Sequence, residues 1–383
     1  MRRLVEIVEW LFRHLITYPF LQLLFRNKYS ENNIDLQTTK KILILRFDRI
    51  GDMIVTTPIF RALKQRNPFV QIGVFTSPSN AEIIRNNPNV DDIYILHRHW
   101  WALSREILRA RKAQYDVVLN FIFNRTSSAG ILANLVAPRG FKIGQGPEKY
   151  RFYFNRLLRL ERSELHMAEV LADYVEQAFG LAIQREEIQF ELIVDERSQL
   201  RVDLFLRRHQ LQRTGLSGGT GEQYIVFNIS ATAAAQKISK EQILGLTRHL
   251  VSTMSCPVVL IGAPSESYAL EATVREVDSD SCHRFPESGA ASLLEIASLV
   301  KGARCVLSPD TSVIHFASAL QTPVLGFFAP SQMAHEWVPY KVHHAAVYAP
   351  SGMPASAIPI QEMTAQVDRF IATLSRREVA ATR

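Results

Sequence analysis

Short, almost wholly apolar segments alternate with helix-forming segments along most of this chain. The first apolar segment covers residues 41–46, the next covers residues 70–76, and a helix-forming stretch separates them. A strand that is apolar on both sides needs helices over both faces, and strand–helix–strand order gives parallel strands joined by right-handed crossovers. The pattern therefore predicts an α/β fold built from doubly wound, Rossmann-like parallel sheets.

Local signals indicate where individual helices begin and end. Thr57 followed by Pro58 is typical of a helix start, with threonine as the N-cap and proline at the first helical position. A further helix is expected after Pro78, as far as Arg85. Gly180 is expected to end a helix, because glycine accepts the left-handed conformation found just past helix C-termini.

The strand series starts again at residues 224–228, and 383 residues exceed what one ordinary core holds. We therefore predict two domains of similar size that face a central cleft. The last helix, about residues 363–375, is expected to fold back on the first domain. The predicted division is an N-terminal extension and linker (1–40), a first Rossmann-like domain (41–190), a connecting helix and loop (191–220), a second Rossmann-like domain (221–355) and a C-terminal helix and tail (356–383).

The chain is basic, with a formal net charge of +7. Such a surplus suits an anionic partner such as a phosphate, an acidic glycolipid, a membrane surface or nucleic acid, although a basic surface without such a partner would give the same number. The three cysteines show no paired spacing, which argues against a disulfide framework or a structural zinc site. We expect a reducing, cytoplasmic location.

Residues 4–25 carry apolar side chains at helical spacing, interrupted by Glu6 and Glu9. No small-residue cleavage site follows, and the uninterrupted apolar part is too short to span a bilayer. Two interpretations remain for this amphipathic segment. It packs on the core of the protein, or it lies on the cytoplasmic face of the inner membrane with Arg2 and Arg3 near anionic head groups.

The loop after the first strand, residues 46–52, contains a candidate catalytic carboxylate. Gly51 allows a tight turn, and Asp52 follows it directly before a helix. A carboxylate at the end of a parallel strand can accept a proton from an incoming hydroxyl group. The alternative is that Asp52 only caps the following helix or accepts hydrogen bonds from loop amides.

A second loop, residues 308–315, joins a strand to a helix in the second half of the chain. Thr311 and Ser312 place hydroxyl groups beside the free amides of a helix start, which suits a diphosphate. His315 lies one turn into that helix, on the side that would face the ligand. The alternative is an ordinary helix cap with a packed histidine.

Together these loops resemble glycosyltransferase family 9, the lipopolysaccharide heptosyltransferases, over about residues 41–331. The motifs that carry the resemblance are Ile50-Gly51-Asp52 followed by Thr56-Thr57-Pro58, Asp310-Thr311-Ser312 followed by His315 and Ala317, the Gly262-Ala263-Pro264 turn, and Lys237 beyond the strand that opens the second domain. The residue after Lys237 is Ile238, where this family usually has an aromatic residue.

The resemblance implies a GT-B fold and inverting, metal-independent transfer of a heptose or related sugar from an ADP-sugar to a lipopolysaccharide core or other envelope glycolipid. The partners would be a nucleotide-diphosphate sugar donor and an anionic glycolipid acceptor, with no cofactor and no metal. By position, Asp52 would be the general base and Lys237 would stabilise the departing diphosphate. The other implied donor-binding residues are Ser230, Thr232, Glu266, Asp310, Thr311, Ser312 and His315.

Residues 97–162 of the acceptor-side domain are rich in arginine and lysine, interleaved with aromatic residues such as Trp100 and Trp101. Arginine suits phosphate and carboxylate groups, and aromatic rings stack on sugars or lie at a lipid interface. The alternative is a set of solvated helix faces with aromatic anchors in the core. The acceptor-side candidates are Gly51, Arg98, Arg125 and Lys142.

Two other functions remain open at the level of sequence. A nucleotide-sugar epimerase can share this fold, but no additional acidic catalytic groups are identifiable. A non-catalytic protein that binds a nucleotide sugar or glycolipid is the second alternative, and the presence of Asp52 and Lys237 argues against it. No Walker loop and no nucleic-acid-binding module is recognisable, so no nucleic-acid partner is expected.

Overall fold

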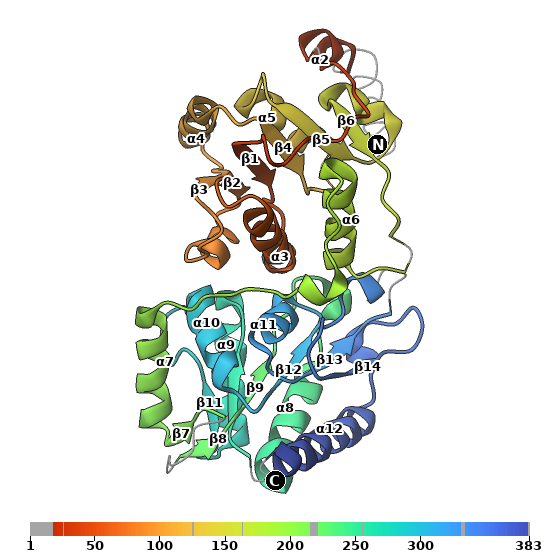
Figure 1. Ribbon diagram of the computed structural model, residues 1–383. Coiled ribbons are helices and arrows are strands. Elements are labelled where there is room, and N and C mark those ends of the chain that lie inside the picture. Colours follow the sequence, from red (N-terminus) through yellow and green to blue (C-terminus); the bar gives the residue numbers. More distant parts are fainter. Residues whose placement is uncertain are drawn as a thin grey trace, which may run out of the picture. The chain divides into compact units, whose positions relative to one another are not determined.

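The computed structural model in Figure 1 describes residues 18–25, 27–124, 126–162, 164–214, 221–254, 256–330 and 334–381. The chain divides into two compact units. Unit 1 comprises Met1–Ala81, Pro88–Arg162 and Ala168–Ile188, and unit 2 comprises Glu82–Asn87, Ser163–Met167 and Gln189–Arg383. Arg2 and Arg3 of the predicted membrane segment lie outside the described residues.

Unit 1 is built on a six-stranded sheet in the order β3-β2-β1-β4-β5-β6, with every pair of neighbours parallel. The strands are β1 (Lys41–Leu45), β2 (Gln71–Thr76), β3 (Asp92–Ile95), β4 (Val117–Asn120), β5 (Phe141–Gln145) and β6 (Arg156–Leu158). The interior of β1 is completely buried, as expected for a strand covered on both faces.

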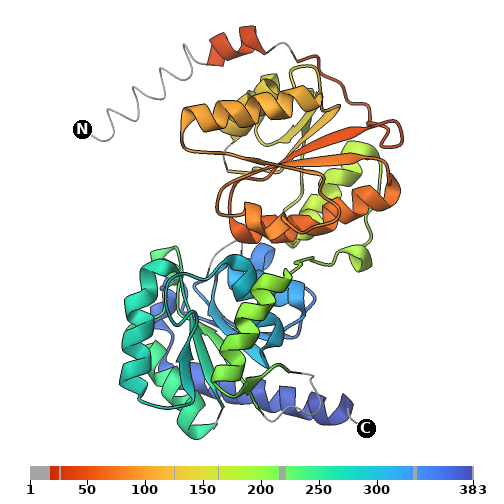
Figure 2. The same cartoon turned by 90° about the vertical axis from the view of Figure 1, so that its left-hand side faces the viewer.

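The helices of unit 1 are α2 (Tyr18–Leu24), α3 (Ile50–Arg66), α4 (Trp100–Ala113), α5 (Thr126–Val136) and α6 (Met167–Phe179). Figure 2 shows the sheet between α4 and α5 on one side and α3 and α6 on the other. Leu103 and Ile107 of α4 pack against the core that α5 closes with Leu132. As predicted, Gly180 follows α6 with a positive φ of 71°.

Unit 2 repeats the same plan with the strand order β11-β10-β9-β12-β13-β14, again fully parallel. Its strands are β9 (Ile225–Asn228), β10 (Val258–Ile261), β11 (Cys282–Arg284), β12 (Cys305–Pro309), β13 (Val324–Phe328) and β14 (His344–Tyr348). Its helices are α7 (Glu196–Arg208), α8 (Lys240–Arg248), α9 (Ser267–Val277), α10 (Leu293–Gly302), α11 (Ser312–Leu320) and α12 (Ile360–Ala381), and β7 (Leu211–Gln212) pairs with β8 (Glu222–Gln223).

The strand order defines one switch point in each unit. In unit 1 the chain winds from β1 out to β3 and then returns to β4 on the other side of β1. In unit 2 it winds from β9 out to β11 and returns to β12 on the other side of β9. Loops diverge at such points, so the carboxyl ends of β1 and β4, and of β9 and β12, are where sheets of this type bind ligands.

The predicted helix start at Thr57 is wrong, because α3 begins at Ile50 and Pro58 lies inside it. Proline has no N–H to donate to the carbonyl four residues earlier. The hydroxyl of Thr57 donates to that carbonyl, the Ile54 oxygen, at 2.7 Å. The helix therefore continues through Pro58, and Asp52 lies in its first turn.

Two further predictions are corrected. The segment between Pro78 and Arg85 forms only a short 3₁₀ turn, Ala81–Ile84. The last helix, α12, does not fold back on the first domain, because Met363 on its apolar face is buried in the core of unit 2. The strands β5, β6, β11 and β14 were not expected, and two of them are only three residues long.

Candidate functional site

Arg46 connects the two sides of the switch point in unit 1. It directly follows β1, and its side chain is completely buried. Its Nε donates to the backbone oxygen of Asp52 at 3.0 Å, and its Nη2 donates to Asp52 Oδ1 at 3.1 Å. Its Nη1 donates to Asp48 Oδ2 at 3.3 Å and to the backbone oxygen of Phe121, which follows β4. One guanidinium group thus fixes two carboxylates and the neighbouring loop.

Asp52 lies in the first turn of α3, and its side chain is 13% exposed. The N-cap of this helix is Arg49, so the interpretation of Asp52 as a cap residue is wrong. A negative charge in the first turn is favoured by the helix dipole, and the ion pair with Arg46 fixes the orientation of the carboxylate. The arrangement presents an oriented carboxylate at the switch point.

Asp48 is a second carboxylate at this point, and sequence reasoning assigned it no role. Burial raises its pKa to about 6, with the charge of Asp52 adding to the rise and that of Arg46 opposing it. Its Oδ1 atom is buried and accepts no hydrogen bond from the described residues. The only signal for Asp48 in the sequence is its place two residues after Arg46, in the loop that follows the first strand.

Asn228 performs the corresponding connection in unit 2, and it too was missed. It ends β9, and its amide nitrogen donates to Ser308 Oγ and to Thr311 Oγ1, both at 3.0 Å. Its Oδ1 accepts from Ser230 Oγ at 3.0 Å. The loops after β9 and β12 are therefore joined through one amide group.

Helix α11 begins at this switch point. Thr311 is its N-cap and Ser312 its first residue, and Thr311 Oγ1 accepts from the amide of Val313 at 3.4 Å. The predicted cap is thus present. This cap does not exclude phosphate binding, because one hydroxyl cannot accept from all the free amides of a helix N-terminus.

The loop that carries Lys237 is connected to both neighbouring loops. Lys237 Nζ lies 3.2 Å from Glu266 Oε1, in the segment after β10, and the lysine side chain is 53% exposed. Gln236 Nε2 donates to Asp310 Oδ2 at 2.7 Å. The fold brings these predicted donor-side residues together, while Thr232 is exposed in the same loop.

His315 is buried within α11, and its ring lies in a T-shaped contact with the ring of Trp337, with 5.9 Å between the centroids. Burial lowers the pKa of His315 to about 4, so the imidazole is neutral at pH 7. Its Nδ1 is buried and has no hydrogen-bond partner among the described residues. At neutral pH this side chain offers a ligand hydrogen bonding rather than positive charge.

The acceptor-side candidates do not share one environment. Gly51 is buried in α3, Arg98 is exposed between β3 and α4, and Arg125 lies outside the described residues. Lys142 is buried in β5, where its Nζ donates to the Gly140 oxygen at 2.8 Å and to an asparagine oxygen at 3.1 Å. Burial lowers its pKa to about 8. Because its ammonium group binds protein oxygens, we withdraw Lys142 as an acceptor contact.

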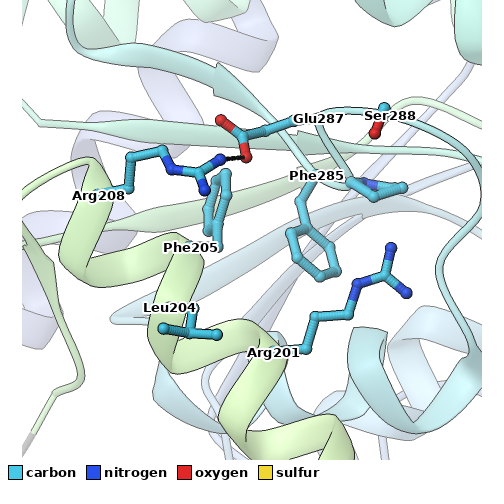
Figure 3. A pocket seen from close by; sticks show the side chains of 8 residues that line it. Arg201, Leu204, Phe205, Arg208, Phe285, Glu287 and Ser288 are labelled. Atoms are coloured by element: carbon cyan, nitrogen blue, oxygen red, sulfur yellow. Dashed lines mark hydrogen bonds and ion pairs between the residues drawn. The ribbon is translucent and has the colours of Figure 1, made fainter.

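A separate pocket of about 220 Å³ lies between α7 and the segment after β11 (Figure 3). It is lined by Arg201, Leu204, Phe205, Arg208, Phe285, Pro286, Glu287 and Ser288. Arg208 pairs with Glu287 across it, and Arg201 pairs with Glu295 at 2.8 Å, so acidic partners already offset both arginines. None of the predicted donor-binding residues lines this pocket.

Two features are absent from the residues that the structure describes, a metal-binding cluster and a membrane-spanning helix. No group of three or more histidine, cysteine, aspartate or glutamate side chains there could hold a metal ion. No helix in the described parts of the chain combines the length and apolar character needed to cross a bilayer.

The family model of glycosyltransferase family 9 (heptosyltransferase) matches residues 100–358. Lipopolysaccharide heptosyltransferase 3 of Escherichia coli is 22% identical over 346 residues, covering 84% of this chain and 96% of that protein. Lipopolysaccharide core heptosyltransferase OpsX of Haemophilus influenzae is 20% identical over 302 residues, covering 76% of this chain and 80% of that protein.

Solved structures show the same architecture. A family 9 glycosyl transferase from Veillonella parvula superimposes with a TM-score of 0.75 at 18% identity, over 90% of this chain and 99% of that one. The E. coli heptosyltransferase WaaC with ADP gives a TM-score of 0.66 at 19% identity, over 86% and 99%. These likenesses confirm the predicted GT-B fold. The family model covers more than half of the chain, and the fold is that of a solved family 9 structure. The chain therefore belongs to glycosyltransferase family 9, the heptosyltransferase family, and is a glycosyltransferase.

Proposed function

We propose that this chain transfers a heptose from ADP-heptose to a lipopolysaccharide-core glycolipid, with inversion at the anomeric carbon and without a metal ion. The names of its relatives support the sugar and the acceptor class, since several are lipopolysaccharide heptosyltransferases. ADP as the leaving group is supported by WaaC, whose structures contain ADP and ADP-2-deoxy-2-fluoro heptose.

The donor diphosphate would bind at the switch point of unit 2. Sugar transfer leaves negative charge on the departing ADP, and fixed positive groups lower the barrier by stabilising that charge. The half-exposed side chain of Lys237 and the amides at the start of α11 are suited to this role. The buried imidazole of His315 would add one hydrogen bond.

The acceptor hydroxyl would be activated at the switch point of unit 1. Asp52 would accept its proton while the oxygen attacks the anomeric carbon opposite the leaving ADP, which is the geometry of inversion. Arg46 would hold the carboxylate for this step through its bond to Oδ1. The oriented pair of Arg46 and Asp52 is the observation that carries the proposal.

We further propose that the enzyme works at the cytoplasmic face of the inner membrane, where a lipid-linked acceptor would be presented. The supporting observations are the net charge of +7 and the exposed apolar residues Phe20 and Leu23 of α2. A basic protein with exposed apolar side chains is suited to an anionic lipid surface.

The test is turnover of the purified protein with ADP-heptose and a set of deacylated lipopolysaccharide cores in EDTA, beside an Asp52→Asn variant. We expect transfer by the wild type and a loss of about 10²- to 10⁴-fold in the variant, with donor binding retained in both. Nuclear magnetic resonance of the product would establish the anomeric configuration.

Each other outcome contradicts one part of the proposal. Transfer that requires added metal would overturn the metal-free mechanism. Full activity in the Asp52→Asn variant would overturn the base assignment. Binding of ADP-heptose without transfer to any core would point to another acceptor, and absence of binding would point to another donor sugar.

A further inference from the structure

We propose that α4 is a docking surface for an anionic lipid bilayer. One face of this helix, here called the α4 stripe, consists of Trp100, Trp101, Arg105, Leu108, Arg111 and Lys112, all of them exposed. These positions fall on one side of the helix at 3.6 residues per turn. The proposal deepens the proposed function, since it names the surface by which an enzyme with a lipid-linked acceptor would reach its substrate.

The opposite face of α4 already has its partner. Leu103 and Ile107 pack against the core of unit 1, and Ala110 is completely buried there. The apolar residues of the α4 stripe therefore are not needed to attach the helix to its own domain. Trp100 is 80% exposed and Trp101 62%, although tryptophan side chains are usually highly buried.

The charges of α4 favour an anionic occupant. Arg105, Arg111 and Lys112 form no ion pair with any described residue. The single acidic side chain of the helix, Glu106, pairs with Arg109 at 3.0 Å. Three unpaired cations beside three large apolar side chains thus lie on the exposed face.

A bilayer fits this combination because tryptophan prefers the level of the lipid head groups, and arginine and lysine bind their phosphates.

The position of α4 in unit 1 also suits an enzyme whose acceptor is lipid-linked. Trp100 begins α4 shortly after β3 ends, so the tryptophans lie toward the carboxyl ends of the strands of unit 1. Asp52 belongs to the loop and helix that follow β1 at that same edge.

Tryptophan fluorescence tests the docking directly. The chain has four tryptophans, so a Trp10→Phe, Trp337→Phe variant leaves only Trp100 and Trp101 as emitters. We expect vesicles of phosphatidylethanolamine and phosphatidylglycerol in a three-to-one ratio to shift this emission to the blue, and brominated lipids to quench it. Emission that stays unchanged and unquenched while the protein is bound to such vesicles would overturn the proposal.

Co-sedimentation of the full chain with the same vesicles measures the contribution of the α4 stripe. We expect Arg105→Gln, Arg111→Gln, Lys112→Gln to weaken binding at least about tenfold and Trp100→Ser, Trp101→Ser to weaken it as well. Phe69→Ser and Tyr268→Ser remove aromatic residues that are 91% and 84% exposed outside α4, and they serve as controls that should bind as the wild type does. Equal losses in controls and α4 variants would contradict the proposal.

Activity separates this inference from the proposed function. With a deacylated, soluble acceptor the Trp100→Ser, Trp101→Ser variant should turn over at the wild-type rate, and with the full glycolipid in vesicles its rate should fall. An equal loss on both acceptors would assign the tryptophans to binding of acceptor sugar and overturn the lipid interpretation. If no acceptor is turned over even by the wild type, the proposed function fails, while the fluorescence and sedimentation results still decide the docking surface.

Discussion

The guanidinium group of Arg46 donates to the carboxylate of Asp52 at 3.1 Å, although a strand-to-helix turn separates the two residues in the chain. The arginine is completely buried, and it also binds the backbone oxygen of Asp52 and the loop after β4. A buried, multiply bonded arginine has little freedom to move, so it fixes where the carboxylate points. This relationship makes the geometry of the proposed base dependent on a residue that need not touch the substrate.

Replacement of Arg46 by lysine tests this dependence. Lysine keeps the charge but cannot form the paired bonds of a planar guanidinium group. We expect kcat to fall about 10- to 100-fold, with the Kd for ADP-heptose unchanged because donor binding is assigned to unit 2. Isothermal titration calorimetry and steady-state kinetics measure the two quantities. An unchanged kcat would contradict the positioning role.

Replacement of Asp48 by asparagine tests the buried carboxylate through pH. Since the pKa of Asp48 is raised to about 6 in the folded state from the ordinary 3.8, the folded protein holds a proton that the unfolded chain has already released between these values. This group therefore lowers stability as pH rises from about 4 to 6, and the penalty remains above that range. As pH rises from 4 to 7, the free energy of unfolding of the variant should therefore increase relative to that of wild type by an amount on the order of 2 kcal/mol.

Chemical unfolding at pH 4, 5, 6 and 7 measures this change for wild type and variant. Asp195→Asn is a suitable comparison, because a hydrogen bond from the Ser198 amide lowers the pKa of Asp195. The pH dependence of its contribution therefore falls mainly below pH 4, and the stability difference for this variant should be nearly constant from pH 4 to pH 7. The free energy of unfolding of Asp48→Asn is compared with that of wild type at each pH. If this difference stays constant across the range, or becomes smaller toward pH 7, the pKa of Asp48 is not raised in the folded protein.

Replacement of Lys237 by methionine tests the stabilisation of the leaving diphosphate. We expect kcat to fall about 100-fold, with little change in melting temperature because the side chain is half exposed. Lys240→Met is the matched control, since Lys240 is also an exposed lysine paired with a glutamate, Glu276, in the same unit. The assignment fails if both variants lose activity equally.

Replacement of Lys142 by methionine tests the conclusion that this residue does not contact the acceptor. The change leaves the Gly140 oxygen and an asparagine oxygen without their donor, so we expect a loss of about 1–3 kcal/mol in stability. The KM for the acceptor should stay within about twofold, because the ammonium group is already bound to protein oxygens. A large rise in acceptor KM with an unchanged melting temperature would restore Lys142 to the acceptor site.

The sequence alone determined the fold class and pointed to the two loops that contain the proposed catalytic and donor-binding residues. Residues 42–45 are apolar on both faces of their strand, and burial of such a run leaves few arrangements except a parallel sheet covered by helices. Thr311 was recognisable as a cap from its place between a strand and a helix. These features depend on neighbours in the chain, so local patterns predict them.

Only the tertiary structure decided which side chains meet. Pro58 continues α3 because the hydroxyl of Thr57 satisfies the carbonyl that proline cannot, a contact that propensities do not predict. Lys237 and Glu266 are 29 residues apart and belong to loops after different strands, and they pair because β9 and β10 are neighbours in the sheet. Hydrogen bonds and burial depend on positions in space, which strand order fixes and sequence spacing does not.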